Sequence, residues 1–421
     1  MIYLSVGRLE IDWGKNYGFT DHSALFQSTD IAEVPYYYVD ENDPQNEDGE
    51  YNVITEYKVG LSKPLTQVVE RITLLGHTLK CARREFDYFS LLNSFDRTKF
   101  SFDQLAQALA SVDVRCVSSD DSEGDDPGDL FRRYIFEQLR LAEIVDDPDY
   151  VRFHLRHGME NLSAYTILLL LAQNPSATNL PVNWQFADVE HGGWARRGEF
   201  VKTLDQSNRF LIVTEGSSDA AIIKHAFGLL KPHLSDFFDF VDMNEGYPFS
   251  GTGNLYNFTK GLISIGVQNN VLIIYDNDAE GVSSFKRTAK LNIPSNMRVL
   301  KLPDLPAFEN FETVGPSGSH RADINGRGAA IECYLDVGSS PVVRWNNYNR
   351  ELEVYHGEIV GKTEIAKRLY TVVNPNEDYD FTKITAVLDM IIKECISLRE
   401  SALLEKLETD IEAESGNDGE A

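Results

Sequence analysis

The chain has 421 residues, of which 42% are hydrophobic, and a formal net charge of −27. This length predicts two domains or one large domain with additions, and the hydrophobic content is that of a folded protein. The excess of 66 acidic over 39 basic residues excludes a general affinity of the whole surface for nucleic acid, because that affinity depends on lysine and arginine side chains that neutralise phosphates. Any nucleic-acid site is therefore expected to be local.

The cysteines and the longest apolar run exclude further classes of protein. The four cysteines lie far apart without a CxxC pair, so neither a zinc ribbon nor a disulfide framework is expected. The run AYTILLLLA (164–172) is too short to cross a bilayer, and the start MIYLSVGRLEIDWG lacks the pattern of a secretion signal. We therefore expect a cytoplasmic protein with reduced cysteines and no membrane partner.

The first 200 residues predict mixed α and β structure that becomes helical. EVPYYYVD (33–40) and YNVITEYKVGL (51–61) alternate apolar and polar residues as strands do, whereas residues 65–112 carry apolar residues at helical spacing. Residues 131–175 are predicted to be helical. NPSATNLPVNW (174–184), with its two prolines, is predicted to break this pattern, and the segment up to GGWARRGEF is expected to be a connection.

We accordingly divide the chain into an N-terminal domain (1–200), a second domain with a C-terminal extension (208–372), and a C-terminal helix with an acidic tail (380–421). Two polar, strongly acidic stretches in the first domain, 40–50 and 118–129, are predicted to be solvated loops.

From residue 208 the chain alternates short apolar strands with helices. The expected strands are RFLIVTE (209–215), FFDFVDM (237–243), NVLIIYDND (270–278) and MRVLKLP (297–303). Repeated alternation of strand and helix predicts an α/β fold in which a Rossmann-like parallel sheet is flanked by helices.

Acidic side chains follow two of these strands at the point where each strand ends. Glu215 closes the first strand and Asp219 lies in the first turn of the next helix, while Asp276 and Asp278 end the third strand. Ligands of parallel sheets bind beyond the carboxyl ends of the strands. Four carboxylates at one edge repel one another unless a cation lies between them, and oxygen ligands favour Mg²⁺ or Mn²⁺.

These residues carry a resemblance to a known family. LIVTEGSSDAAII contains an EGxxD pattern and IIYDNDAEG a DxDxxG pattern, and together they resemble the Toprim domain of topoisomerases, bacterial-type primases and OLD family nucleases. The N-terminal IDWGKNYGFTDHSALF, with ADINGRGAAIECYL and YHGEIVGKTEIAK, resembles HEPN/Toprim-associated proteins, which are connected with phage defence. The resemblance implies a Toprim-like sheet preceded by a HEPN/Toprim-associated N-terminal domain.

The Toprim resemblance also implies roles for the acidic residues. Glu215 would act beside the scissile phosphate as general acid or base, or as a metal ligand, and Asp276 and Asp278 would hold Mg²⁺. Asp219 would contribute to a second metal ion, and a pair of ions stabilises the attacking and leaving oxygens of the displacement.

The nuclease branch of the family further implies a glutamate and a lysine after the DxD pattern. Glu332 is our candidate for the metal ligand, and Lys362 for the cation that stabilises the developing charge on phosphate. Glu280 is interpreted as an acid of the first helical turn rather than a ligand.

Two other motifs lead to weaker interpretations. GEIVGKT (357–363) resembles a P-loop but has one residue too few between its glycines to close the phosphate cradle. Arg152 and His157 match the RxxxxH pattern of HEPN ribonucleases, and a second RNase site there is the alternative to a basic, solvated helix face, which we favour.

The sequence therefore predicts a Mg²⁺- or Mn²⁺-dependent nuclease that hydrolyses phosphodiester bonds in DNA or RNA during antiviral defence. A topoisomerase would need a DNA-gate domain and a primase a zinc module, and a dehalogenase-type phosphatase would continue its DxD differently. The alternative from another class is a non-catalytic sensor or scaffold that binds a cation. Because no ATPase motif is present, control by homo-oligomerisation or by an ATPase or sensor partner is expected.

Overall fold

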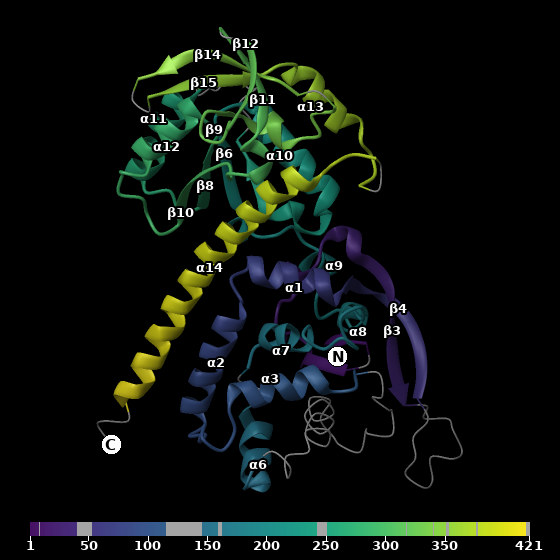
Figure 1. The fold of residues 1–421 in the computed structure, drawn as a ribbon. Helices are drawn as coiled ribbons and strands as arrows, with labels where there is room; N and C mark the ends of the chain where they lie inside the picture. Colours follow the sequence, from purple (N-terminus) through teal and green to yellow (C-terminus); the bar gives the residue numbers. More distant parts are fainter. Residues whose placement is uncertain are drawn as a thin grey trace, which may run out of the picture. The chain divides into compact units, whose positions relative to one another are not determined.

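The computed structural model describes residues 1–7, 9–39, 53–114, 145–158, 162–241, 251–316, 318–339, 341–350, 353–375 and 378–417. The chain divides into two compact units (Figure 1). Unit 1 comprises Met1–Leu204 and Arg399–Ala421, and unit 2 comprises Asp205–Leu398. The long helix α14 (Thr382–Asn417) contributes residues to both units.

Unit 1 contains a five-stranded sheet in the order β2-β1-β5-β4-β3, in which all neighbours are antiparallel. Its strands are β1 (Ile2–Val6), β2 (Leu9–Gly14), β3 (Ile31–Val39), β4 (Val53–Pro64) and β5 (Pro181–Gln185). Among the described residues of unit 1, the α-helices before α14 are α1 (Leu65–Leu74), α2 (Leu79–Leu92), α3 (Phe102–Ser111), α6 (Pro148–Gly158), α7 (Ala164–Leu171), α8 (Ala187–His191) and α9 (Arg197–Phe200).

The apolar helix α7 forms the centre of the helical layer of unit 1. Every residue from Thr166 to Leu171 is buried, as expected of a helix that is hydrophobic on all sides. It packs against α1, α2, α3 and β2. Helices α6 and α7 agree with the prediction that residues 131–175 are helical. Residues 131–144 and 159–161 of that range lie outside the described residues, and so do the two acidic stretches, 40–50 and 118–129.

The helical pattern ends at Leu171, as the predicted break requires, but the prediction of a connection is wrong at Pro181–Gln185, which forms the central strand β5. Its polar residues Asn183 and Gln185 are buried, and Tyr3 of β1 and Leu61 of β4 lie opposite residues of β5. Proline is tolerated at the first residue of a strand, so Pro181 marks the start of β5 rather than a loop.

Unit 2 contains the predicted parallel sheet, in the order β10-β8-β6-β7. The strands are β6 (Phe210–Thr214), β7 (Phe238–Phe240), β8 (Asn270–Tyr275) and β10 (Met297–Lys301). Helices α10 (Ser217–Leu230), α11 (Thr252–Ile265) and α12 (Ala279–Thr288) follow the first three strands. A parallel sheet flanked by helices is thus confirmed.

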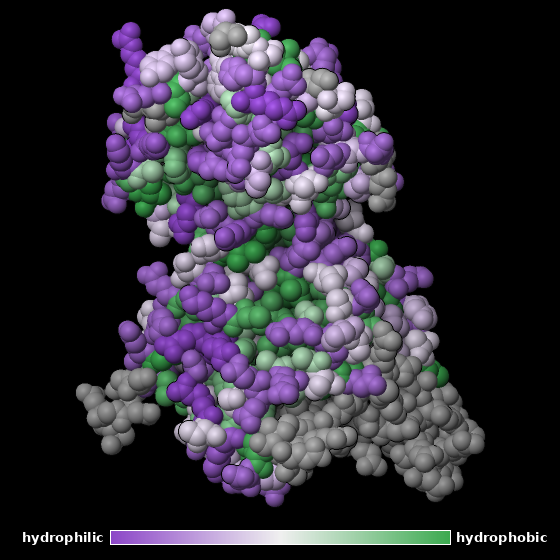
Figure 2. Space-filling view, in the orientation of Figure 1, coloured by the Kyte–Doolittle hydropathy of each residue, from purple (hydrophilic) through white to green (hydrophobic). Residues whose placement is uncertain are grey.

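One face of this sheet forms the core of unit 2 with α11. Val213, Val271 and Ile273 of the strands pack with Leu255 and Leu262 of α11. Hydrophilic side chains predominate on the face of unit 2 that Figure 2 shows, and the apolar strand residues are buried.

A second sheet of unit 2, in the order β12-β11-β14-β15, was not predicted. It consists of β11 (Phe311–Gly315), β12 (Gly318–Ala322), β14 (Val343–Asn349) and β15 (Val354–Ile359), and α13 (Lys362–Thr371) follows it. A short ladder joins β9 (Asn277–Asp278) to β13 (Gly328–Ala329), and the 3₁₀-helix η10 spans Ile331–Tyr334.

The predictions about the cysteines and about membrane spans can be compared with the described residues. Cys81, Cys333 and Cys395 are free and buried, whereas Cys116 lies outside the described residues. No helix in the described part of the chain combines the length and the apolar character that a membrane span requires.

Candidate active site

The strand order of the parallel sheet places two acidic residues side by side. The chain passes from β6 to β7 on one side and then to β8 on the other side of β6, so the carboxyl ends of β6 and β8 form the switch point where such sheets bind ligands. Glu215 follows β6 and Asp276 follows β8. The backbone N–H of Asp276 donates a hydrogen bond of 2.9 Å to Glu215 Oε1.

The Asp276–Asp278 segment is fixed by backbone donors from two other elements. Ile331 N, at the start of η10, donates to Asp276 Oδ1 at 3.1 Å, and Gly281 N donates to Asp278 Oδ1 at 2.7 Å. Asp278 is therefore the N-terminal cap of α12. Pairing of β9 with β13 holds the same segment in extended form.

Gly281, the glycine of the DxDxxG pattern, is required by close packing. A Cβ atom at this position would lie 2.3 Å from the carbonyl oxygen of Asp276 and 2.9 Å from Glu215 Oε1. Such contacts are far inside van der Waals distance. Only glycine lets the first turn of α12 approach the two carboxylates this closely.

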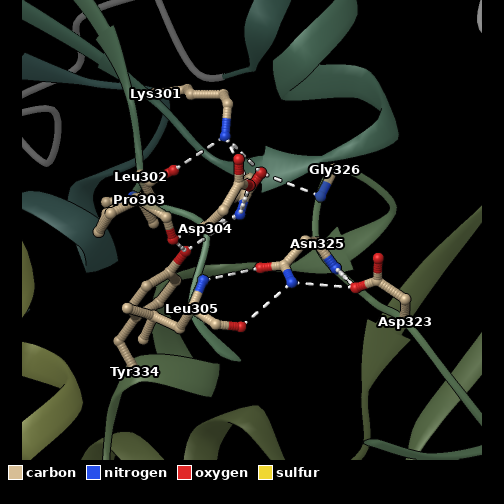
Figure 3. A network of polar contacts seen from close by, with 10 residues as sticks. Lys301, Leu302, Pro303, Asp304, Leu305, Asp323, Asn325, Gly326 and Tyr334 are labelled. Atoms are coloured by element: carbon tan, nitrogen blue, oxygen red, sulfur yellow. Dashed lines mark hydrogen bonds and ion pairs between the residues drawn. The ribbon is translucent and has the colours of Figure 1, made fainter. Parts of the chain in front are cut away.

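Asn277, between the two aspartates, is the centre of a buried polar network. Its side-chain amide donates to Asp304 Oδ1 at 2.9 Å, and its Oδ1 accepts from Lys301 Nζ at 3.0 Å and from Gly326 N at 2.9 Å. The amide also lies 3.3 Å from the Tyr334 hydroxyl. Figure 3 shows these neighbours around the 301–305 and 323–326 segments. The network fixes the loop so that the flanking aspartates are held at the sheet edge.

Asp219 occupies the third position of α10 and is engaged by local donors. Its Oδ2 accepts from Gly216 N at 3.0 Å, and its Oδ1 accepts from the Ser218 hydroxyl at 3.1 Å. Asp219 thus stabilises the start of α10, whose dipole favours a negative charge there. Coordination of a cation by Asp219 would replace at least one of these bonds.

Glu332 and Lys362 reach the same region from η10 and α13. Glu332 is buried, with 7% of its surface exposed, and its carboxylate has no hydrogen bond or ion pair within the described part of the chain. Lys362 Nζ lies 3.1 Å from Glu358 Oε1. Burial alone would lower the pKa of Lys362, but attraction to Glu332, Glu358 and Asp276 raises it. Lys362 therefore remains a cation beside the acidic residues.

His356 of β15 was not singled out from the sequence. Its Nδ1 lies 3.8 Å from Asp278 Oδ2 and, although buried, has no hydrogen-bond partner among the described residues. His356 and Asp278 lie far apart in the sequence, so only the folded structure shows that their side chains are neighbours. Asn277 was missed for another reason, since it occupies the unspecified position of the DxD pattern.

Burial and mutual repulsion make the carboxylates difficult to ionise together. Burial, followed by the charge of Asp278, raises the pKa of Glu215 to about 8. Burial, followed by the charge of Glu332, raises the pKa of Asp219 to about 6. For Asp276, which is partly buried, burial and the charges of Asp219 and Glu215 raise the pKa well above its ordinary value. These shifts show that the site holds more negative charge than its protein surroundings neutralise.

The pKa of Asp278 is raised less strongly for a structural reason. Burial raises it, whereas the Gly281 N–H and the charges of His356 and Lys362 lower it. Glu280, in the first turn of α12, is exposed. The structure therefore brings together the six predicted site residues around the β6–β8 edge, namely Glu215, Asp219, Asp276, Asp278, Glu332 and Lys362, and leaves Glu280 at the surface.

The donor set fits a hard cation in its chemistry but is not a preformed cage. Among the described residues, no group of three or more His, Cys, Asp or Glu side chains is arranged to hold a metal ion. Nevertheless, the second carboxylate oxygens of Glu215 and Asp276 accept no hydrogen bond from any described residue. Oxygen donors and surplus negative charge suit Mg²⁺ or Mn²⁺.

The proposed RNase pair cannot be placed in the same way. Arg152 and His157 belong to α6, but their side chains lie outside what the structure describes.

Comparison with known proteins gives one match. Residues 1–208 match the sequence model of the family HEPN/Toprim N-terminal domain 1. No curated protein and no solved structure matches the chain. The match ends before Glu215, so it concerns the first part of the chain and not the acidic site. It shows that residues 1–208 are similar to the N-terminal domain of HEPN/Toprim proteins.

Proposed function

We propose that the chain is a Mg²⁺- or Mn²⁺-dependent nuclease of the Toprim type, similar to the OLD family, that hydrolyses phosphodiester bonds of nucleic acid in antiviral defence. The family match suggests a nuclease-associated role. The observation that carries the proposal is the gathering of Glu215, Asp276 and Asp278 at the switch point of the sheet, with pKa values raised by burial and by mutual repulsion.

Asp276, Asp278 and Glu215 would hold the cation, and Glu332 is a further oxygen donor. When bound, a divalent cation supplies charge stabilisation to the phosphate and activates water as a nucleophile. The Ile331 and Gly281 N–H groups orient Asp276 and Asp278 toward this task. Lys362 supplies positive charge to the phosphate oxygens.

Glu215 is suited to proton transfer as well as to ligation. A general acid or base works best when its pKa lies near the working pH, and burial raises the pKa of Glu215 to about 8 in the metal-free chain. The hydrogen bond from Asp276 N fixes one carboxylate oxygen. The second oxygen is left for water or phosphate.

A second function, a non-catalytic sensor or scaffold with a cation-binding site, is favoured by one specific observation. Both oxygens of Asp219 serve the start of α10, and the described acidic side chains form no preformed cage. A degenerate site could therefore bind a cation without cleaving a phosphodiester bond.

The experiment that separates these functions combines cleavage with cation binding. Labelled supercoiled DNA, single-stranded DNA and total tRNA are incubated with Mg²⁺ or Mn²⁺ and wild type, Glu215→Gln or Asp276→Asn, and Mn²⁺ binding is measured by calorimetry. Cleavage that both variants and EDTA abolish supports the nuclease. Mn²⁺ binding that requires Asp276, without cleavage of any substrate, supports the sensor.

Control by a partner is a separate part of the proposal. A nuclease that acts without restraint would be toxic, and no ATPase motif is evident in the sequence, so we infer that an ATPase or sensor partner or homo-oligomerisation controls activity. Purification from the native host should recover an associated chain or an oligomer. A monomer that is fully active alone would contradict this inference.

A further inference from the structure

The second sheet of unit 2 carries a pocket that the proposed chemistry does not use. Its volume is about 540 Å³, within the range of small-molecule sites. Residues of β11, β12, β14 and β15 line it, and Figure 1 labels these four strands. Three aromatic residues, Trp345, Tyr348 and Tyr355, line it together with His320 and Arg327. We propose that this pocket holds an unpaired base of the nucleic-acid strand that the acidic site cleaves, an inference that rests on the proposed function.

The aromatic walls are presented to solvent rather than packed into a core. Tyr348 and Tyr355 are 50% and 54% exposed, and their rings meet edge to face with centroids 5.2 Å apart. Two tyrosines directly opposite each other on β14 and β15 offer ring faces and edges at the rim. Stacking on such rings is available to every base, because each base has a π face.

Trp345 is held in place by two glycines. A Cβ atom at Gly357 would lie 2.9 Å from Trp345 Cε3, and one at Gly315 would lie 3.2 Å from Trp345 Cδ1. Glycine at both positions therefore lets the indole lie directly against the backbone of the neighbouring strands. This fixed, half-buried ring forms a wall that needs no rearrangement to accept a flat ligand.

The charge of the pocket suits a phosphate beside the base. Arg327 is exposed and, within the described residues, has neither an ion pair nor a side-chain hydrogen bond. Elsewhere in this acidic chain, arginines such as Arg368 pair with carboxylates. One acid, Glu353, also lines the pocket, so the positive charge is local, as the composition requires.

The pocket shares backbone with the acidic site. Arg327 forms a β-bridge with Asp278, and Gly357 N donates to the carbonyl of Arg327 at 2.8 Å. Tyr355 directly precedes His356 on β15, so the two side chains point to opposite faces of the strand, and the His356 ring lies beside Asp278. A strand with one base in the pocket therefore reaches the carboxylates past Arg327, at the edge of β15.

An unpaired strand is the substrate that this arrangement favours. In a duplex both faces of each base are covered by stacked neighbours, so a base must first be extruded before it can contact Tyr348 or Tyr355, which costs a few kcal/mol. A single strand presents its bases without that cost. We therefore expect the pocket to prefer single strands or unpaired loops.

The test measures binding without cleavage. A short fluorescein-labelled single strand, as DNA and as RNA, is titrated with the full chain in EDTA and followed by fluorescence anisotropy, with the matching duplex as a second probe. Tyr348→Ala with Tyr355→Ala should weaken single-strand binding about 5- to 100-fold, and Arg327→Ala severalfold. Tyr57→Ala removes an equally exposed tyrosine, 65% exposed on β4 of unit 1, and should change nothing.

The outcomes separate the pocket from the catalytic proposal. Weakened single-strand binding in the tyrosine variants, with duplex bound at least tenfold more weakly, supports the pocket even when no substrate is cleaved, and in that case the catalytic proposal fails alone. Equal binding by wild type and the tyrosine variants overturns the pocket, as does the absence of single-strand binding by wild type. Circular dichroism of each variant checks that folding is unchanged.

Discussion

Unit 1 and unit 2 both bury ionisable side chains, but they surround them differently. In unit 1, Lys63 is 2% exposed and lies 2.9 Å from Asp30 Oδ2, and the fully buried Arg71 donates to the carbonyls of Ala24 and Phe26. In unit 2, the carboxylates after β6 and β8 have backbone donors and each other as neighbours. Partners offset the desolvation cost of a buried charge in a fold, whereas several buried charges without enough partners indicate a binding site.

Among the described residues, unit 1 also contains a carboxylate with a buried, unpaired oxygen, that of Glu10. It belongs to unit 1, burial raises its pKa to about 7, and its Oε2 has no hydrogen-bond partner among the described residues. A single buried carboxylate with a raised pKa is therefore not a sufficient signal. The convergence of several carboxylates on one sheet edge is what distinguishes the site of unit 2.

The largest expected effect comes from Asp276→Asn. Loss of a metal-holding carboxylate should lower the cleavage rate about 10³-fold or more, since metal assistance contributes several kcal/mol. In EDTA the same variant should be more stable to urea than wild type, because a buried, repelled charge is removed while Asn Oδ1 still accepts from Ile331 N.

Asp205→Asn is the matched control for this variant, since Asp205 is exposed at the start of unit 2 and its side chain caps no helix. It should leave both cleavage and stability unchanged. A drop in stability of Asp276→Asn in EDTA would show that Asp276 is a structural residue like those of unit 1.

The second expected effect is a loss of stability of unit 2 with rising pH in the absence of divalent cations. The folded pKa of Glu215, about 8, exceeds its ordinary value of 4.5, so the native state holds a proton that the unfolded chain has released. The contribution of Glu215 to stability is therefore fully present below pH 4.5 and is lost as pH rises toward 8, with ~1.4 kcal/mol for each unit of pKa difference.

Urea unfolding in EDTA at several pH values measures this decline. Trp345 is the tryptophan of unit 2, the others being Trp13, Trp184 and Trp194, and subtraction of the Trp345→Phe signal isolates its fluorescence. Glu215→Gln should flatten the pH dependence, and Mg²⁺ should restore stability at pH 8 by binding the folded form. A flat profile for wild type would remove the basis of the comparison.

The third expected effect is a loss of stability of unit 1 when the carboxylate of Glu85 is removed. Its carboxylate accepts from the backbone N–H and the hydroxyl of Ser163 and, at 2.5 Å, from the Thr166 hydroxyl. Glu85→Ala leaves these donors unsatisfied at the start of α7 and should lower the free energy of unfolding by about 2 kcal/mol. Glu33→Ala, an exposed glutamate of β3, should not. Cleavage per folded molecule should stay at the wild-type value, and a loss of cleavage would connect unit 1 to catalysis.

The parallel sheet could be predicted from the sequence because its signals are local. Each of its strands is a short apolar run bounded by polar residues. Because ligands bind at the carboxyl ends of parallel strands, the sequence also predicts that Glu215 and Asp276 lie close together. The hydrogen bond between Asp276 N and Glu215 agrees with that reasoning.

The remaining features depend on pairing between distant residues. β5 is a central strand because β1 and β4 flank it, and Pro181 and buried Asn183 disguise it. The environment of Asn277 is created by the 301–305 segment and by Gly326, and that of His356 by β15 reaching Asp278. No local pattern encodes such contacts, so the polar network and the pocket could not be predicted.

The smallest effect concerns Lys362, whose ion pair with Glu358 is half exposed. Such a pair contributes ~0–1 kcal/mol to stability, so Lys362→Met should leave the urea midpoint nearly unchanged. Its charge, however, is attracted to Glu332 and Asp276, and its loss should lower the cleavage rate about tenfold, which corresponds to ~1.4 kcal/mol of transition-state stabilisation. Lys362→Arg should recover part of the rate.

Two further variants show whether Lys362 acts on the substrate or through its ion pair. Glu358→Gln removes the partner and retains the lysine, and Lys367→Met removes an exposed lysine of the same helix; both should cleave at the wild-type rate. If Glu358→Gln slows cleavage as much as Lys362→Met does, the pair holds β15 and α13 in place and Lys362 is a positioning residue. If neither variant slows cleavage, the positive charge at the acidic site has no role in the reaction, and the comparison between the units then rests on the carboxylates alone.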